Sequence, residues 1–287
     1  MNAVTNEAAV AEYADRTGYD PAFLGTTNAL RVDLPAKTTS PGDLLTFGTG
    51  RDETSELKYE HFSVAMSVSR RLCLWSAVNV DGPSTSHAKR PGFRTDPRIP
   101  RDAQIGDVDV YGDAPRFARG HMTRREDPIW GPADDAKLGN RDSMHYTNVV
   151  PQMQSFNGGI WNNLEDYGLL NAERDMMRIN VITGPIFAAE DPERFGVQIP
   201  LRFWKVIAFI HDETKQLTAT GYVMSQQDFL APQEFVFGDF ATSQVPIKDI
   251  EQQTGLAFGA LSARDPIGGR PRGTRVPLAR LDHIVLT

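Results

Sequence analysis

The feature that most limits the fold is a set of apolar, β-branched runs separated by turn residues. Residues 61–82 (HFSVAMSVSRRLCLWSAVNVDG) are rich in valine and leucine and end at an Asp-Gly turn signal, which predicts two strands or one long bent strand. Residues 179–187 (INVITGPIF) and 202–210 (RFWKVIAFI) are almost wholly apolar, which predicts buried central strands. Residues 216–225 (QLTATGYVMS) predict a further strand.

Two shorter segments also have the pattern of strands. Residues 107–112 (DVDVYG) alternate between acidic and apolar side chains, as a half-buried strand does. Residues 146–152 (YTNVVPQ) predict a strand that stops at Pro151, because proline has no N–H to donate to a sheet.

Helical spacing is limited to a few places. In residues 155–176 (SFNGGIWNNLEDYGLLNAERDM) the apolar side chains roughly follow a helical period, with Asn157 at the expected helix start. Residues 246–258 (PIKDIEQQTGLAF) predict a short helix that ends near Gly255. Strands thus outnumber helices and are intermixed with them, which indicates an α+β fold around a mainly antiparallel central sheet.

The length of 287 residues allows one large domain or two small ones. We expect residues 1–16 to be a flexible N-terminal lead-in, or a short amphipathic helix, and residues 17–287 to form a single domain. No run approaches the roughly 20 apolar residues of a membrane span, and the N-terminus lacks the basic flank and apolar centre of a signal peptide. These features predict a cytoplasmic protein without a membrane partner. Cys73 is the single cysteine and lies in an apolar run, so we expect it to be a buried small hydrophobe.

Charge is unevenly distributed along the chain. The formal net charge is −7, which argues against a surface uniformly suited to nucleic acid. Residues 89–125 are nevertheless basic, and arginine outnumbers lysine in this segment, as suits bidentate phosphate contacts. Its cations are Lys89, Arg90, Arg94, Arg98, Arg101, Arg116, Arg119, Arg124 and Arg125. Solvated surface arginines are the alternative interpretation.

The stretch ARGHMTRRED, residues 118–127, gathers one histidine and three arginines. A histidine is more often structural than catalytic, but Gly120 next to His121 permits an unusual backbone or a close approach to a ligand. Nearby cations should keep the imidazole neutral and able to accept a proton near pH 7. A base that deprotonates water for attack on phosphorus needs these properties.

A second group lies in residues 157–165 (NGGIWNNLE). Eight helical steps of about 100° place Asn157 and Glu165 roughly 80° apart and about 12 Å along the axis, on one broad face. An amide oxygen with mostly water ligands suits Mg²⁺, and Glu165 would then hold a metal-bound water. A helix N-cap and a solvated glutamate are the alternative reading of these two residues.

Taken together, these segments resemble the sugar-nonspecific DNA/RNA endonucleases. The family signature is an Asp-Arg-Gly-His tetrad followed by an Asn-x-Gly-x-Trp-x-x-Leu-Glu helix, and here the two motifs are ARGH (118–121) and NGGIWNNLE (157–165). The similarity runs in the family's order from about residue 19 to about residue 258. One departure is Ala118, which stands where the family has aspartate. An acid there could orient the strand or an arginine but would not transfer a proton, so we expect an active enzyme.

The resemblance implies a ββα-metal (His-Me finger) active site with defined roles. His121 would be the general base, Asn157 the one direct protein ligand to Mg²⁺, with Mn²⁺ as a substitute, and Glu165 would position the water shell of the ion. Arg119 would stabilise the charge on the scissile phosphate. Candidate substrate-binding residues are Arg90 or Arg94, between which the spacing does not decide, with Arg124 and Gln152.

The implied reaction is hydrolysis of phosphodiester bonds in DNA, and in RNA as a further candidate, with little sequence preference and 5′-phosphate products. Two alternatives stay open: a pseudo-nuclease that binds nucleic acid without cutting it, and a phosphodiesterase acting on small nucleotides. A homodimer and an inhibitor or regulatory partner are also expected candidates. The biological role and the preference between DNA and RNA do not follow from the sequence.

Overall fold

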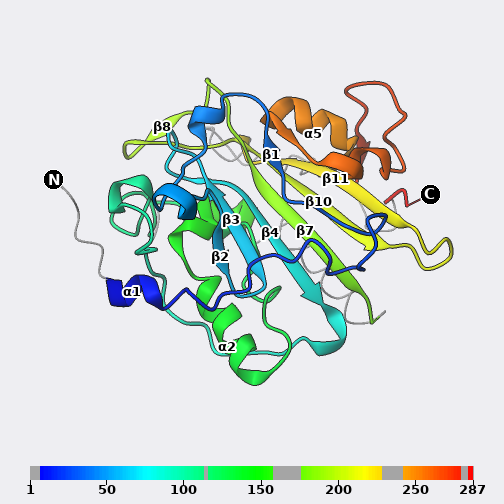
Figure 1. The fold of residues 1–287 in the computed structure, drawn as a ribbon. Helices are drawn as coiled ribbons and strands as arrows, with labels where there is room; N and C mark the ends of the chain where they lie inside the picture. The colour runs from blue at the N-terminus through cyan, green and yellow to red at the C-terminus, as the bar shows by residue number, and fades with distance from the viewer. Residues whose placement is uncertain (1–6, 113–115, 158–175, 228–241, 279–283, 287) are drawn as a thin grey trace.

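The computed structural model describes residues 7–112, 116–157, 176–227, 242–278 and 284–286 (Figure 1). Its main feature is an eight-stranded sheet in which all neighbouring strands are antiparallel. From edge to edge the strands are β14 (Val276–Pro277), β12 (Ser243–Val245), β11 (Leu217–Ser225), β10 (Arg202–Ile210), β7 (Arg178–Ile186), β4 (Cys73–Asp81), β3 (Phe62–Met66) and β2 (Leu57–Tyr59). The predicted α+β fold with a mainly antiparallel sheet is confirmed.

The four long central strands come from the runs that are richest in β-branched and aromatic residues. Residues 61–82 form two strands, β3 and β4, rather than one bent strand. Every residue of β4 is buried, including Cys73, because both faces of the sheet are covered. Strands β7 and β10 pair in register from Ile186 with Arg202 to Ile179 with Phe209, which confirms them as central strands.

The two faces of the sheet bury separate cores. Trp204 points to one face, where it packs with Ile247 and Ile250 of helix α5 (Ile247–Thr254). Helix α5 lies across this face near β11 in Figure 1. Its predicted end near Gly255 is confirmed, because Gly255 adopts a left-handed conformation (φ 63°) and its N–H bonds the carbonyl of Glu251. The opposite face packs against the elements that carry the candidate site.

Those elements are two short strands and two helices. Strands β5 (Ala118–His121) and β6 (Val149–Gln152) form an antiparallel pair outside the main sheet. Helix α2 (Ala133–Asp142) lies between them in the chain, and α3 (Gln154–Asn157) follows β6 and contacts β5. Val149 and Val150 of β6 are fully buried in the core. The strand pair is therefore anchored to the sheet through β6.

The remaining elements are short. Helix α1 spans Glu7–Ala11, β1 (Ala36–Lys37) pairs with β13 (Leu256–Ala257), and β8 (Glu193–Arg194) pairs with β9 (Val197–Gln198). The 3-10 helices are η1 (Pro41–Asp43), η2 (Gly50–Asp52), η3 (Gly82–Ser84), η4 (Arg101–Ala103), η5 (Tyr146–Asn148) and η7 (Gly259–Ala263). Within the described ranges, no helix has both the length and the apolar character needed to span a bilayer.

Two local predictions are wrong. Residues 107–110 form a turn, and Tyr111 makes only an isolated bridge with Phe117. The Asp109 N–H, which a strand would use for pairing, bonds the Gly106 carbonyl, and the Asp109 carboxylate accepts a bond from the Gly106 N–H at 2.6 Å. Strand β6 does not stop at Pro151 but continues to Gln152. Proline is tolerated there because β6 belongs to a two-stranded pair, in which one edge needs no N–H.

The segment before residue 17 packs onto the domain. Tyr13 is 6% exposed and Arg16 8% exposed. The Arg16 guanidinium Nε lies 2.5 Å from a carboxylate oxygen of Asp142, at the end of α2. The packed domain therefore includes at least these two residues of the predicted lead-in.

Candidate active site

Strand β5 presents two of the predicted site residues on the same face. Side chains alternate along a strand, and here Ala118 and Gly120 are buried while Arg119 and His121 are partly exposed. His121 pairs with Val149 of β6. The strand thus holds an imidazole and a guanidinium side by side at the edge of the domain.

His121 has an unsatisfied nitrogen. Its Nε2 is buried, and no residue of the described chain hydrogen bonds to it. The pKa of His121 is lowered to about 3, mainly by burial and also by the charges of Arg90 and Arg125. The lowered pKa agrees with the predicted neutral imidazole, although burial rather than the cations is the largest cause of the shift.

Phe93 brings the arginines to the histidine. The ring centroid of Phe93 lies 5.4 Å from that of His121. The guanidinium carbons of Arg90 and Arg119 lie 5.5 and 5.1 Å from the centroid of the Phe93 ring. Burial lowers the pKa of Arg90, as do the charges of Arg125 and Arg119. Three cations therefore crowd one place, which an anionic ligand would stabilise.

The structure separates the two upstream arginines that the sequence leaves as alternatives. Arg90 lies against Phe93 and acts on His121. Arg94 instead forms an ion pair with Glu12, with 3.6 Å between Nη1 and Oε1. Arg90 is the one that joins the candidate site.

The other arginines are held by acidic partners. Arg119 hydrogen bonds Asp107, and its pKa is raised despite burial through bonds to Asp107 and Tyr146. Arg124 and Arg125 both pair with Glu126, at 2.8 and 2.6 Å. Arg125, which was not predicted as a site residue, is the downstream arginine that acts electrostatically on His121. Its only sequence signal was its place in the basic stretch.

Gly120 is required by a side chain rather than by backbone conformation. It is not among the residues with a left-handed φ. A Cβ added at Gly120 would instead collide with the side chain of Gln152, which lies over it. Gln152 pairs across the strands with Ala118 and is fully buried, and neither atom of its amide has a partner among the described residues. The glutamine is therefore held beside β5 with its amide uncommitted.

The predicted metal site is only partly described. Asn157 is the last described residue of α3, which begins at Gln154, three residues before the predicted start. Because α3 contacts β5, the chain at Asn157 follows directly from the strand pair that carries His121. Glu165 lies outside the described residues, so its predicted role stays a prediction.

Two antiparallel strands followed by a helix that contacts them form the ββα arrangement that the resemblance implies. A family model for DNA/RNA non-specific endonucleases matches residues 40–265. A Sinorhizobium fredii protein, "Uncharacterized protein y4fB", is 37% identical over 276 residues, which cover 86% of this chain and 40% of that protein. Human mitochondrial endonuclease G is 27% identical over 180 residues, which cover 58% of this chain and 55% of that protein.

A further sequence relative and a solved structure agree with the family match. The mitochondrial nuclease EXOG of Xenopus laevis is 25% identical over 236 residues, which cover 74% of this chain and 60% of that protein. The chain thus spans between two fifths and three fifths of the length of these relatives. A crystal structure of the EndoG/EndoGI complex superposes with a TM-score of 0.55 at 20% identity, over 71% of this chain and 84% of that chain. It supports the fold.

The fold is that of a ββα-type nuclease domain. The family match over residues 40–265 shows that the chain belongs to the DNA/RNA non-specific endonuclease family.

Proposed function

We propose that the chain is a metal-dependent endonuclease that hydrolyses phosphodiester bonds with little sequence preference. The observation that carries the proposal is His121, a neutral imidazole whose buried Nε2 has no partner among the described residues, beside Arg90, Arg119 and Arg125. A buried polar atom without a partner is unfavourable, and such atoms are concentrated at functional sites. Family membership supports the same activity.

His121 would act as the general base. Its lowered pKa keeps Nε2 unprotonated at neutral pH, so the lone pair can take a proton from an attacking water. The water oxygen then forms the new bond to phosphorus as the bond to the 3′-oxygen breaks, and the leaving 3′-oxygen takes up a proton from solvent. The products carry a 5′-phosphate and a 3′-hydroxyl.

The arginines would bind the phosphate. Arg119 shares a strand face with His121, so its guanidinium can bind the equatorial oxygens on which negative charge grows during the reaction. Arg90 contacts the same Phe93 ring and would hold a neighbouring non-bridging oxygen. Arg124 and Gln152 are further substrate contacts in this proposal.

The residues present also fit a divalent ion. The amide of Gln152 and Nε2 of His121 are buried without described partners, on the strand pair that α3 follows and contacts. Asn157, at the end of α3, has the type of side chain whose amide oxygen Mg²⁺ binds. Asn157 would hold Mg²⁺ or Mn²⁺, with Glu165 orienting its waters. The bound ion would neutralise charge on the phosphate and its leaving oxygen.

The proposed substrate is a polymer, DNA or RNA. Because the predicted contacts are to phosphate, binding should be insensitive to base sequence and should weaken steeply with salt. One related structure is described as showing the mechanism of EndoG inhibition in a complex. By analogy, we propose an inhibitor or regulatory partner for this chain, with a homodimer as its candidate assembly.

A plasmid-nicking assay on the purified chain tests the proposal. We expect supercoiled DNA to be cut with Mg²⁺ and not with EDTA, and Asn157→Ala to lower both activity and the response to metal. Binding without cutting would instead identify a pseudo-nuclease. Faster turnover of a dinucleotide than of supercoiled DNA would identify a small-nucleotide phosphodiesterase.

A further inference from the structure

A second group of metal-binding side chains lies outside the candidate active site. Glu60 and His61 form the turn between β2 and β3, and Asp135 lies in the first turn of α2. One ligand atom from each residue lies within 4.8 Å of the other two. Glu60 is 4% exposed and His61 6% exposed. The β2–β3 turn and helix α2 thus present an imidazole and two carboxylates to one point.

The hydrogen bonding of His61 fixes which nitrogen faces this point. Its Nδ1 lies 2.9 Å from the backbone carbonyl oxygen of Pro128. A carbonyl can only accept, so Nδ1 carries the hydrogen and a neutral ring presents a lone pair at Nε2. A metal-binding histidine commonly donates its other N–H to a carbonyl in this way. The ring is further held by face-to-face stacking on Trp130, with centroids 3.4 Å apart.

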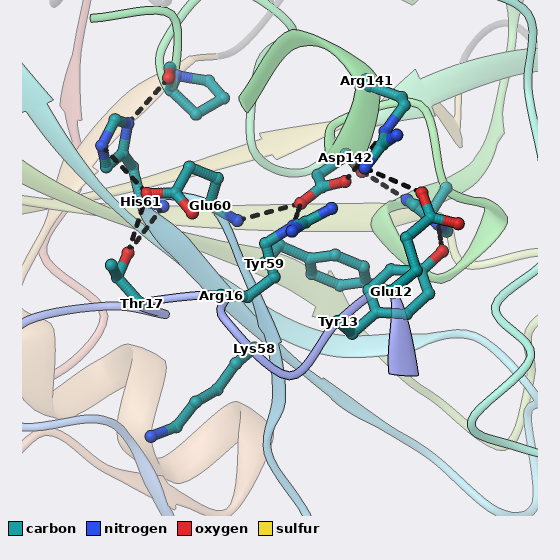
Figure 2. Close-up of polar contacts among 12 residues, drawn as sticks. Glu12, Tyr13, Arg16, Thr17, Lys58, Tyr59, Glu60, His61, Arg141 and Asp142 are labelled. Atoms are coloured by element: carbon teal, nitrogen blue, oxygen red, sulfur yellow. Dashed lines mark hydrogen bonds and ion pairs between the residues drawn. The ribbon is translucent and has the colours of Figure 1, made fainter. Parts of the chain in front are cut away.

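That lone pair faces a carboxylate. His61 Nε2 lies 3.4 Å from Oε1 of Glu60, and Figure 2 shows the two side chains next to each other above Thr17. This separation is longer than an ordinary hydrogen bond. Two ligands that share a tetrahedral zinc at bond lengths of 2.0–2.1 Å stand about 3.4 Å apart. The observed spacing is therefore that of two ligands of one ion.

The buried surroundings disfavour a direct approach of the His61 Nε2 lone pair to the Glu60 carboxylate. Burial raises the pKa of Glu60, and the charges of Asp135 and Asp142 act in the same direction. Burial lowers the pKa of His61. Two lone-pair donors that turn toward each other in a poorly solvated place repel unless a proton or a cation lies between them.

We propose that Glu60, His61 and Asp135 form a divalent-cation site of the zinc type, separate from the active site. The fourth position would be open to water, and rotation of the Asp135 side chain would bring its carboxylate to the ion. The bound ion would join the β2–β3 turn to α2, and so stabilise the domain in proportion to its occupancy. The proposal is independent of nuclease activity.

Zinc binding by the full chain tests the proposal. The chain is stripped with EDTA, dialysed and titrated with zinc chloride against a chromogenic chelator, in the Asn157→Ala background so that the predicted catalytic ligand is absent. We expect one zinc per chain, a higher melting temperature with zinc, and visible absorption of tetrahedral type when cobalt(II) replaces zinc.

Matched variants locate the ion. Glu60→Gln keeps an oxygen for the bond from Thr17, and Asp135→Asn changes only a partly exposed side chain, so both should fold. Each should weaken zinc binding at least tenfold. Asp134→Asn, a neighbour that is exposed and paired with Lys137 at 2.9 Å, should leave zinc binding unchanged. Equal zinc affinity in all three variants, or no zinc binding by the parent chain, would overturn the proposal.

Discussion

Two histidines of this domain both have a lowered pKa but differ in their hydrogen bonds. His145 is fully buried, with Nδ1 2.7 Å from the backbone carbonyl oxygen of Asp142 and Nε2 2.6 Å from the hydroxyl of Tyr13. His121 leaves its buried Nε2 without a partner among the described residues. Burial is the largest cause of a lowered pKa in both. A depressed pKa therefore does not distinguish a structural histidine from a functional one, whereas hydrogen-bond satisfaction does.

The surroundings of the two rings repeat this contrast. Near His145, the Tyr59 hydroxyl and the Arg98 guanidinium both hydrogen bond the buried carboxylate of Asp96, and the neighbouring carboxylate of Asp142 lies between Arg16 and Arg141 in Figure 2. Buried networks of this kind fix a structure. Near His121, the Arg119 Nε and the Gln152 amide are buried without described partners. Uncommitted polar atoms are what a ligand site needs.

The largest expected effect is on catalysis. His121→Ala should lower the rate of plasmid nicking by about 10²–10⁴-fold, the usual contribution of a general base, while DNA binding and stability change little. His87→Ala, an exposed histidine, is the control and should retain full activity. Strong residual cutting by His121→Ala would show that another group is the base.

The stability of the folded chain should depend on pH through His121. Its folded pKa of about 3 lies below the unfolded value of about 6.5, so the folded state excludes a proton that the unfolded chain binds. Stability linked to His121 is complete above pH 6.5 and is lost as the pH falls toward 3, by roughly 3 kcal/mol at about pH 4. Urea unfolding should show His121→Asn losing less stability than the parent over this range. Equal losses would mean that the folded ring titrates normally.

The base should also stay available in mild acid. Because His121 is unprotonated well below pH 6.5, the nicking rate per folded molecule should not fall with a midpoint near 6.5. A titration of that kind in the rate would assign the base a normal pKa.

His145, whose two ring nitrogens are both hydrogen bonded, should affect stability rather than catalysis. His145→Phe keeps ring contacts with Tyr13 and Tyr59 but leaves the Tyr13 hydroxyl without its bond to the ring. It also removes the ring's bond to the Asp142 carbonyl, which keeps the bond from the His145 N–H. We expect a loss of about 2 kcal/mol in the free energy of unfolding, measured by urea denaturation, with normal nicking per folded molecule. A variant that is stable but inactive would place His145 in catalysis and break the comparison.

The packing of Gln152 over Gly120 gives a smaller, coupled effect. Gly120→Ala should cost about 1–2 kcal/mol of stability, because the new methyl group displaces the glutamine side chain. Gln152→Ala should remove most of that cost, since the two side chains would no longer collide. A double-mutant cycle by urea denaturation measures this coupling. Additive costs would show that the strain at Gly120 lies elsewhere.

The sequence predicts the central strands well because their apolar, β-branched side chains favour buried strands whatever their neighbours in space. It fails at residues 107–112, where the Asp109 N–H bonds the Gly106 carbonyl and the Asp109 carboxylate accepts a bond from the Gly106 N–H, which closes a turn. Periodicity describes which face a side chain occupies, but not whether a side chain competes for the backbone. Local hydrogen bonding of this kind is settled only in three dimensions.

The candidate site was also predicted only in part. His121 could be proposed from its glycine and arginine neighbours, but the reason for Gly120 could not, because it depends on the register between β5 and β6. The choice of Arg90 over Arg94 likewise depends on which guanidinium meets the ring of Phe93. Contacts across strands and around an aromatic ring have no linear signal in the chain.

The smallest expected effect belongs to an arginine at the margin of the site. Arg124 pairs with Glu126 at 2.8 Å, so it would meet substrate as a partly neutralised cation. Arg124→Ala should raise the apparent KM for plasmid DNA about threefold, in the range of a single exposed charge contact, and leave kcat unchanged. The increase should shrink at higher salt, where screening weakens the same contact. A large fall in kcat would instead place Arg124 with Arg119 at the reacting phosphate, and the basic stretch after His121 would then be part of the catalytic centre.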